Sequence, residues 1–192
     1  MDCNARCRSG RRKRRPYGLI GALALISASP ATVPAADVFP RSWVGHWKGD
    51  LNAETLSGKQ SLKMELIIAA TDDPKRFTWT IVYDGPQGRQ ERPYFLEVVD
   101  ATAGRYVIDE GNGIRLSAWF SHGDTLTSAF DVGESSLVST DRFDAERGTI
   151  ESQIISYRRP VKPATQPVEV VKGFGVTAFD VIAVQRATLR RD

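Results

Sequence analysis

Apolar and polar residues alternate with a period of two along most of the chain after residue 42. In residues 61–68, for example, Leu62, Met64, Leu66 and Ile68 occupy every second position. This alternation is typical of β-strands, whose successive side chains point to opposite faces. It predicts strands at residues 43–51, 61–68, 76–83, 92–99, 105–110, 114–120, 125–132, 136–143, 149–157 and 181–191. No long segment carries apolar residues at helical spacing, so the chain is expected to be all-β.

Short turn sequences separate these segments. Asp84-Gly-Pro86 and Ser121-His-Gly-Asp124 are two of them, and such residues favour tight connections between antiparallel strands. A meander of this length closes on itself to protect its edge strands, so we predict one antiparallel up-and-down β-barrel of about eight to ten strands. Residues 158–174 contain three prolines and are expected to form a long crossing loop before the last strand.

The two ends of this region carry the most specific features. In residues 43–51, Trp43, Gly45, Trp47, Gly49 and Leu51 share one strand face, which we interpret as the interior. Glycines between tryptophans remove side-chain volume where strands crowd together. Gly45-His-Trp47 also forms a Gly-x-Trp motif, and the segment 181–191 is a strand rich in arginine.

On the Gly-x-Trp motif and the arginine-bearing last strand, the chain resembles the calycin superfamily, which includes lipocalins, fatty-acid-binding proteins and nitrobindin-like barrels. The resemblance implies that the first and last strands pair to close the barrel, and that an arginine of the last strand lies over the first-strand tryptophan. Gly45, Trp47 and Arg186 are the residues expected to form this closure. A guanidinium over an indole ring contributes about 0.5 to 2 kcal/mol, depending on desolvation.

The first 35 residues have the composition of a cleaved signal peptide. A basic head ends at Arg15, an apolar run covers residues 19–26, and Val33-Pro-Ala35 provides small residues for cleavage. The apolar run is shorter than the about 20 residues of a membrane-spanning helix. We therefore expect a signal peptide at 1–35, a barrel domain at 36–192, and export to the periplasm or the extracellular space. The Arg14-Arg15 pair leaves the twin-arginine route open beside general secretion.

Removal of the leader changes the charge and the chemistry of the chain. Seven of the 26 basic residues and one of the 23 acidic residues lie in it, which leaves 19 against 22, so the mature protein is mildly acidic and a nucleic-acid partner is not expected. Cys3 and Cys7 are the two cysteines, and both lie in the leader. The mature chain then has no disulfide, no thiolate site and no cysteine for a lipid anchor.

Asn112-Gly113 suits a two-residue type I′ hairpin turn. With that loop length, Glu110 faces Arg115 and Asp109 shares a face with Leu116. A three-residue loop would exchange the two faces. Asp109 is then either a polar group of a ligand site or, as Asp residues commonly are, a cap on its own turn.

Serines recur among large apolar residues on the faces assigned to the interior. These faces are Leu126, Ser128, Phe130 and Val132; Leu137, Ser139 and Phe143; and Ile150, Ser152, Ile154 and Ser156. The small hydroxyl residues either leave room for a ligand or only fill a tapered barrel. Trp43, Trp47, Trp79, Tyr94 and Trp119 are each expected in the core rather than in an aromatic pocket. If a ligand site exists, we expect Trp79, Tyr94, Asp109 and Ser128 to border it.

Catalytic and metal chemistry have little support. His46 and His122 are the only histidines, and a zinc site needs at least three protein ligands at suitable spacing. Nitrobindin-like barrels hold haem through a histidine late in the chain, and no histidine follows His122. We expect no metal and no cofactor, and the chain has no nucleophile elbow, phosphate loop or zincin motif.

Three functions remain. The first is an exported barrel that binds a small, largely apolar molecule in its lumen. The second is a structural or interaction module with a solid core. The third is an isomerase or cyclase, which would need Asp109 or Glu110 buried beside a second polar group in a pocket.

Overall fold

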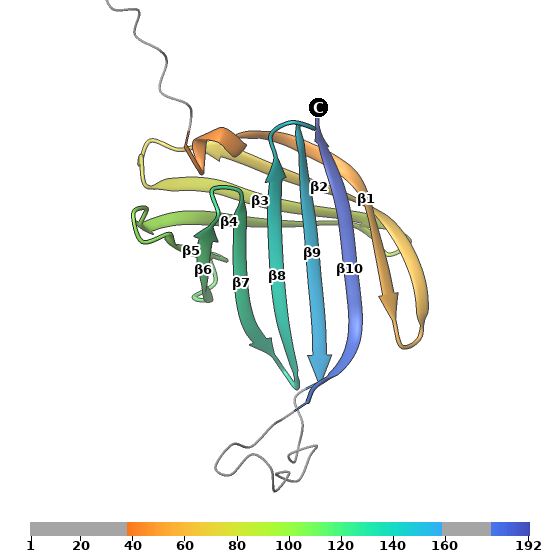
Figure 1. Ribbon diagram of the computed structural model, residues 1–192. Helices are drawn as coiled ribbons and strands as arrows, with labels where there is room; N and C mark the ends of the chain where they lie inside the picture. The colour runs from red at the N-terminus through yellow and green to blue at the C-terminus, as the bar shows by residue number, and fades with distance from the viewer. Residues whose placement is uncertain (1–37, 159–177) are drawn as a thin grey trace, which may run out of the picture. The chain divides into compact units, whose positions relative to one another are not determined.

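Residues 38–158 and 178–192 form a closed ten-stranded antiparallel barrel in the computed structural model (Figure 1). The 3₁₀-helix η1 (Arg41–Trp43) precedes the first strand. The strands are β1 (Gly45–Thr55), β2 (Gly58–Ala70), β3 (Arg76–Gly85), β4 (Gly88–Asp100), β5 (Arg105–Asp109), β6 (Arg115–Ser121), β7 (Thr125–Val132), β8 (Ser135–Asp144), β9 (Thr149–Arg158) and β10 (Asp180–Arg191). Each strand pairs with its neighbours in sequence, and β1 pairs with β10 to close the cylinder. The prediction of an all-β up-and-down barrel is confirmed.

The sequence pattern located all ten strands to within a few residues at each end. The largest differences are at β1 and β4, which extend four residues beyond the predicted strand at one end. Trp43 lies in η1 rather than in β1. The expected signal peptide and most of the expected crossing loop fall outside the described residues, so both stay predictions. In the described part of the chain, no helix is long and apolar enough to cross a membrane.

The barrel has two unlike ends, which we name the plugged end and the mouth. At the plugged end, η1 and the residues around it fill the lumen with aromatic rings. Phe39 stacks on Phe120 with ring centroids 4.1 Å apart and meets Trp43 edge-on at 4.7 Å. The mouth is the opposite end, where the short β3–β4 and β7–β8 turns lie. Strands β1, β3, β5, β7 and β9 run from the plugged end to the mouth, and the others return.

The predicted interior face of the first strand is confirmed by burial. Trp47, Leu51 and Ala53 are buried, and Trp47 donates a hydrogen bond from Nε1 to the carbonyl oxygen of Trp43 at 2.8 Å. Gly49 lies against β10, where a Cβ atom would stand 2.3 Å from the backbone oxygen of Thr188. A side chain at this position would therefore push β1 and β10 apart, which explains the glycine between the inward residues.

The closure residue on β10 is Arg191, not Arg186. The guanidinium carbon of Arg191 lies 4.5 Å from the centroid of a Trp47 ring, and the two residues are cross-strand partners. Arg186 is exposed on the outer face, opposite Asn52 of β1 and Gln153 of β9. The prediction of Arg186 was wrong because inward positions of β10 have odd numbers, as buried Ala187 and Leu189 show.

Candidate ligand cavity

A cavity of about 960 Å³ occupies the half of the barrel nearest the mouth. Trp79 lies at its inner end, where the ring is 6.2 Å from that of Trp43 in the aromatic plug. The mouth contributes Gly85, Pro86, Gln87 and Gly88 from the β3–β4 connection and Val132 and Ser135 beside the β7–β8 turn. The cavity is thus closed by the plug at one end and bordered by turns at the other.

One wall of the cavity is largely apolar. Its side chains come from β2, β3, β5 and β6, where every second residue points inward: Leu62, Trp79, Ile81, Ile108 and Leu116. Aliphatic and aromatic side chains at these positions provide a surface for the apolar body of a ligand.

The opposite wall carries hydroxyl groups on three adjacent strands. Ser128 of β7 is the cross-strand partner of Ser139 of β8, and Ser156 of β9 is the partner of Leu137. All three serines line the cavity. The inward placement predicted for the serines of β7, β8 and β9 is confirmed. Ser128 is 4% exposed, and its Oγ has no hydrogen-bond partner among the described residues.

A buried carboxylate, Asp141, lies on the same wall. Its side chain is inward on β8, between Leu126 of β7 and Ser152 of β9, and the residue is 8% exposed. Burial raises the pKa of Asp141 to about 6, and the hydrogen bond from Ser152 opposes this by lowering it. At neutral pH the group is therefore mostly charged, although it lies in a poorly solvated place.

Asp141 was not among the predicted site residues. The signal for it was present, because Asp141 occupies the position between the predicted inward residues Ser139 and Phe143 on a strand with period two. Aspartate is rarely buried, so its residue type argues against the inward position that the period of two gives it.

Polar and aromatic groups gather nearer the mouth. Arg92 lies over the ring of Tyr83 at 5.2 Å from its centroid, and both residues line the cavity with Tyr94 and Glu110. Burial raises the pKa of the Tyr83 hydroxyl; the charge of Arg92 opposes this shift, and that of Asp141 adds to it. Burial also raises the pKa of Tyr94, and the charge of Glu110 adds to the effect. Tyr83 thus lies within electrostatic range of both Arg92 and the buried Asp141.

Three of the four residues expected to border a ligand site line this cavity, namely Trp79, Tyr94 and Ser128. Asp109 does not, and the prediction that it faces the lumen was wrong. The β5–β6 loop contains three residues between Glu110 and Ile114, whose backbone groups bond at 3.0 Å, and Asp109 pairs with Arg115. Glu110 takes the inward position instead.

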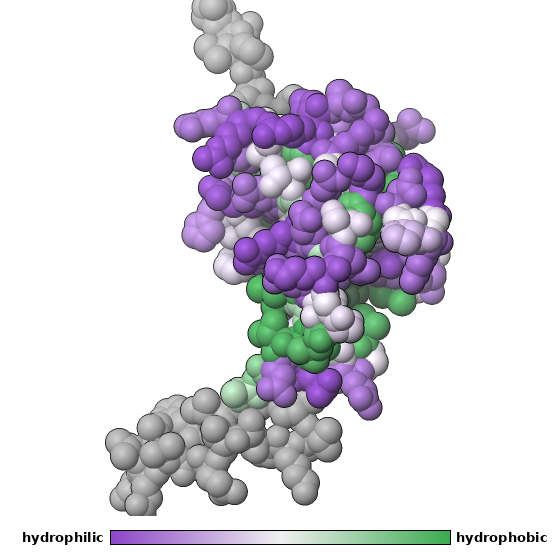
Figure 2. Space-filling view, turned by 90° about the vertical axis from the view of Figure 1, so that its right-hand side faces the viewer, coloured by the Kyte–Doolittle hydropathy of each residue, from purple (hydrophilic) through white to green (hydrophobic). Residues whose placement is uncertain are grey.

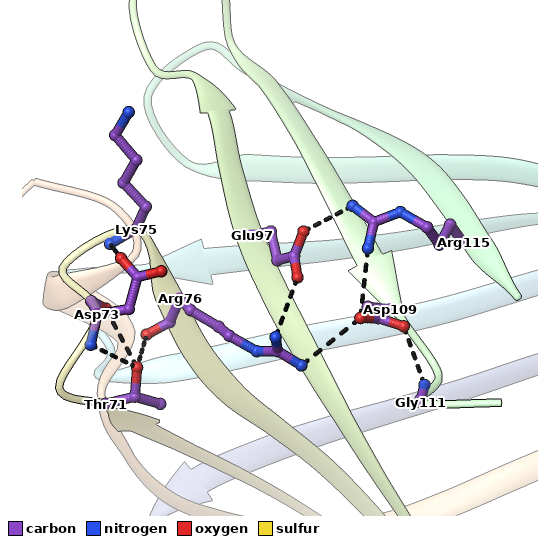
Figure 3. A network of polar contacts seen from close by, with 8 residues as sticks. All are labelled: Thr71, Asp73, Lys75, Arg76, Glu97, Asp109, Gly111 and Arg115. Carbon is purple, nitrogen blue, oxygen red and sulfur yellow. Dashed lines mark hydrogen bonds and ion pairs between the residues drawn. The ribbon is translucent and has the colours of Figure 1, made fainter. Parts of the chain in front are cut away.

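Asp109 belongs to an ion-pair network on the outer face of the barrel (Figure 3). Its Oδ2 lies 3.5 Å from Arg76 and 3.3 Å from Arg115, and both arginines also contact Glu97, at 3.5 and 2.6 Å. Its Oδ1 accepts a hydrogen bond from the backbone amide of Gly111 at 3.0 Å. The second reading of Asp109, a cap on its own turn, is therefore confirmed.

Replacing Asp109 with asparagine should leave ligand binding unchanged and lower stability by about 1 kcal/mol or less, because partly exposed ion pairs contribute little. Urea unfolding and probe titration of the same preparation measure both effects. A clear loss of probe affinity in Asp109→Asn, with the fold intact, would contradict this placement of the residue.

The two histidines lie away from the cavity lining. His46 shares a hydrogen bond of 2.8 Å with Glu65, and His122 occupies the β6–β7 turn with a positive φ of 56°. Among the described residues, no group of three or more histidine, cysteine, aspartate and glutamate side chains is placed to hold a metal ion.

Comparison with models of protein families gives no match, and comparison with curated proteins gives none either. Comparison with solved structures finds proteins of similar fold, among them the following two. One is an S-type phycobiliprotein lyase from Guillardia theta, with a TM-score of 0.51 and 12% identity over 78% of this chain and 88% of the other. The second is a protein of unknown function of the DUF3598 family from Nostoc punctiforme, with a TM-score of 0.51 and 10% identity over 78% of this chain.

The chain spans 47% of the length of the DUF3598 protein, about half. At these identities the similarity concerns the fold alone. The closed antiparallel barrel is consistent with a calycin-like fold, in agreement with the fold expected from the two ends of the sequence.

Proposed function

We propose that this protein binds a small molecule with a largely apolar body in the lumen of its barrel. The observation that carries the proposal is the cavity of about 960 Å³, which has an apolar wall facing a wall of hydroxyl groups and one carboxylate. Ligand sites commonly have volumes of about 300 to 1,000 Å³ and combine many apolar side chains with few polar groups.

The size of the cavity favours a binding protein over a structural module with a solid core. A packed barrel fills its lumen with side chains, as the plugged end of this barrel does. In the other half, the small serine side chains on β7, β8 and β9 leave space that larger residues would fill.

The surface around the mouth suits the entry of an apolar molecule. Exposed large hydrophobic side chains lie on the connections and strand ends at the mouth: Leu56, Ile114, Val132, Phe179 and Val181. In Figure 2, hydrophobic residues gather at the lower end of the barrel, while most of the remaining visible surface is hydrophilic. Exposed apolar patches of this kind often mark the entrance of a ligand-binding site.

Binding can be tested by titrating the purified protein with neutral apolar fluorescent probes such as N-phenyl-1-naphthylamine and following tryptophan quenching. Ser128→Phe places a large side chain into the cavity and should weaken the probe at least about tenfold, since it occupies the binding volume. Ala129→Phe adds the same ring to the outer face of β7, where Ala129 is exposed, and is the matched control.

Saturable binding that Ser128→Phe removes and Ala129→Phe retains would support a lumen site. Absence of saturable binding across a broad panel of lipids and aromatic compounds would support the solid module instead. Equal binding by the two phenylalanine variants would place the probe outside the barrel.

Catalysis is a second candidate, favoured by one observation. An isomerase or cyclase needs a buried carboxyl group in a pocket, and Asp141 rather than Asp109 or Glu110 provides it. The pKa of Asp141, about 6, suits proton transfer near neutral pH. An isomerase would lose turnover in Asp141→Asn while keeping substrate affinity, whereas a carrier would show no turnover in either form.

The proposal also includes export, on the basis of the basic, apolar and small-residue segments of residues 1–35. The mass of the protein isolated from its own host tests it. A mature chain that begins at Ala36 is the expected result, and a full-length chain would contradict it.

A further inference from the structure

The carboxylate of Asp141 has no cationic partner in the described part of the chain. Among the described residues, the hydroxyl of Ser152 is the only group that stabilises the negative charge of Asp141. Burial of the carboxylate destabilises that charge. A buried charge without a counter-charge is costly, and an ionised carboxylate accepts several hydrogen bonds. The cavity wall thus contains an acceptor whose capacity the described residues do not fill.

A hydroxyl group without a hydrogen-bond partner among the described residues lies close to Asp141. Ser139 and Asp141 are two residues apart on β8, so they point to the same face about 7 Å apart along the strand. Ser128, whose Oγ has no partner among the described residues, stands opposite Ser139 on β7. Side chains directly opposite each other on paired strands have Cβ atoms about 5 Å apart. One small polar group of a ligand can therefore reach the carboxylate and at least one of the two hydroxyls.

The charged residues that line the cavity indicate whether the polar group of the ligand is positive or negative. Among the described residues that border the cavity, the acidic side chains are Glu110, Asp131 and Asp141, and the basic one is Arg92. Arg92 is exposed and lies over Tyr83 nearer the mouth. A low-dielectric cavity with an excess of carboxylates attracts cations and repels anions.

Aromatic rings in the same lumen favour the same kind of ligand. Trp79 and Tyr83 belong to β3 and line the cavity. The charge of Asp141 acts on the Tyr83 hydroxyl, which places that ring within electrostatic range of the carboxylate. Indole and phenol faces attract cations, and the attraction is strongest where water is excluded.

We infer that the ligand of this barrel is a protonated amine on an apolar body, with the ammonium group bound at Asp141 beside Ser128 and Ser139. The inference rests on the proposed function and deepens it, because it names the class of molecule that the lumen selects. The apolar body then contacts the wall formed by β2, β3, β5 and β6.

Three compounds with one naphthalene body separate charge from hydrophobicity: 2-naphthylmethylamine, 2-naphthalenemethanol and 2-naphthoate. Calorimetric titration of the full chain at pH 8 should show the amine binding at least about tenfold more tightly than the alcohol, since a charged hydrogen bond contributes about 1.5 to 3 kcal/mol. The carboxylate compound should bind most weakly of the three.

Asp141→Asn keeps the size of the side chain and removes its charge. It should reduce amine affinity at least about tenfold and change alcohol affinity less than about threefold. Glu151→Gln removes a carboxylate from the exposed outer face of the neighbouring strand β9 and is the matched control, for which we expect the preference for the amine to persist.

A pH series on the unaltered protein tests the same point without a substitution. The alkylammonium group keeps its charge between pH 8 and pH 5, whereas Asp141 takes up a proton as the pH falls through its pKa of about 6. Glu110, Asp131, Tyr83, Tyr94 and Arg92 are the other titratable groups of the cavity lining. Amine affinity should fall over this range, and the fall should be absent in Asp141→Asn.

Equal affinity for amine and alcohol, tighter binding of the naphthoate, or an amine preference that survives in Asp141→Asn would each overturn the inference. In all three cases at least one of the three compounds still binds, so the proposed binding function stands. If none of the three compounds and none of the neutral probes binds, the proposed function itself fails.

Discussion

Replacing Trp47 with alanine should lower the free energy of unfolding by about 3 to 5 kcal/mol, because it leaves a cavity in the aromatic plug. Trp47 is 1% exposed, and its ring meets that of Phe143 at 5.8 Å. Its Nε1 hydrogen bond to Trp43 also fixes η1 against the barrel. Urea unfolding at neutral pH measures the change, and full retention of stability would show that the Gly-x-Trp motif is not a closure element here.

Two arginine variants test which arginine of β10 stabilises the fold through a cation–π contact with Trp47. Arg191→Met should lower stability by about 0.5 to 2 kcal/mol, since the guanidinium lies over the indole and also donates to the carbonyl oxygen of Ser42 at 3.2 Å. Arg186→Met changes an exposed outer residue on the same strand and is the control. In the background of Trp47→Ala, the effect of Arg191→Met should shrink, as a double-mutant cycle measures. An effect that stays the same would mean that Arg191 acts through other contacts.

The strands of this barrel could be predicted because their signal is local. Alternation with a period of two identifies both the strand and its inward face, and it does so without knowledge of the neighbours. The faces of β7, β8 and β9 were therefore found correctly from serines and apolar residues alone. Trp119 shows the limit of arguing from residue type, because the tryptophan is 62% exposed while Ala118 and Phe120 take the inward positions.

Whether a given side chain points into the lumen can depend on a shift of one residue in strand register, and such positions were harder to predict than the strands. The β5–β6 loop contains one residue more than the expected type I′ turn, and that difference exchanged Asp109 and Glu110 between the two faces. Residue type alone does not distinguish Arg186, Arg190 and Arg191 on β10, whereas parity with the buried Ala187 and Leu189 selects Arg191.

The open lumen is a property of the whole barrel. It depends on how ten inward faces share one volume, which no single strand determines. The sequence showed the small residues on β7, β8 and β9 but left open whether side chains from the opposite wall reach them. In the structure they do not, and the space of about 960 Å³ remains beside Ser128 and Asp141.

Asp141→Asn should make the ligand-free protein more stable at pH 8, by about 2 to 3 kcal/mol. Burial raises the pKa of Asp141 from its usual value of 3.8 to about 6, so the folded state holds this proton more tightly than the unfolded state does. Between pH 4 and pH 6 the folded protein binds more protons, and stability must therefore fall as the pH rises through this range. Each pKa unit corresponds to about 1.4 kcal/mol, which gives the size of the expected effect.

The direction of the stability change in Asp141→Asn and the pH range over which it develops distinguish it from a change in packing. At pH 4 the carboxyl is protonated in the folded protein and about half protonated in the unfolded chain, so the substitution should change stability by less than about 1 kcal/mol there; the gain should grow between pH 4 and pH 6 and stay constant above. The neighbours on β7 and β9, Leu126 and Ser152, do not titrate in this range, and Tyr83 titrates far above it.

Urea unfolding of the two proteins at pH 4, 5, 6, 7 and 8 measures the effect, with Glu110→Gln as the control for a carboxylate nearer the mouth. A loss of stability in Asp141→Asn at pH 8 would contradict the prediction and would mean that the carboxylate is paired in the folded protein. A gain would show that the folded barrel keeps a charge that opposes its own stability. Only a bound cation would then convert that charge into a favourable interaction, so 2-naphthylmethylamine should stabilise the unaltered protein more than Asp141→Asn at pH 8.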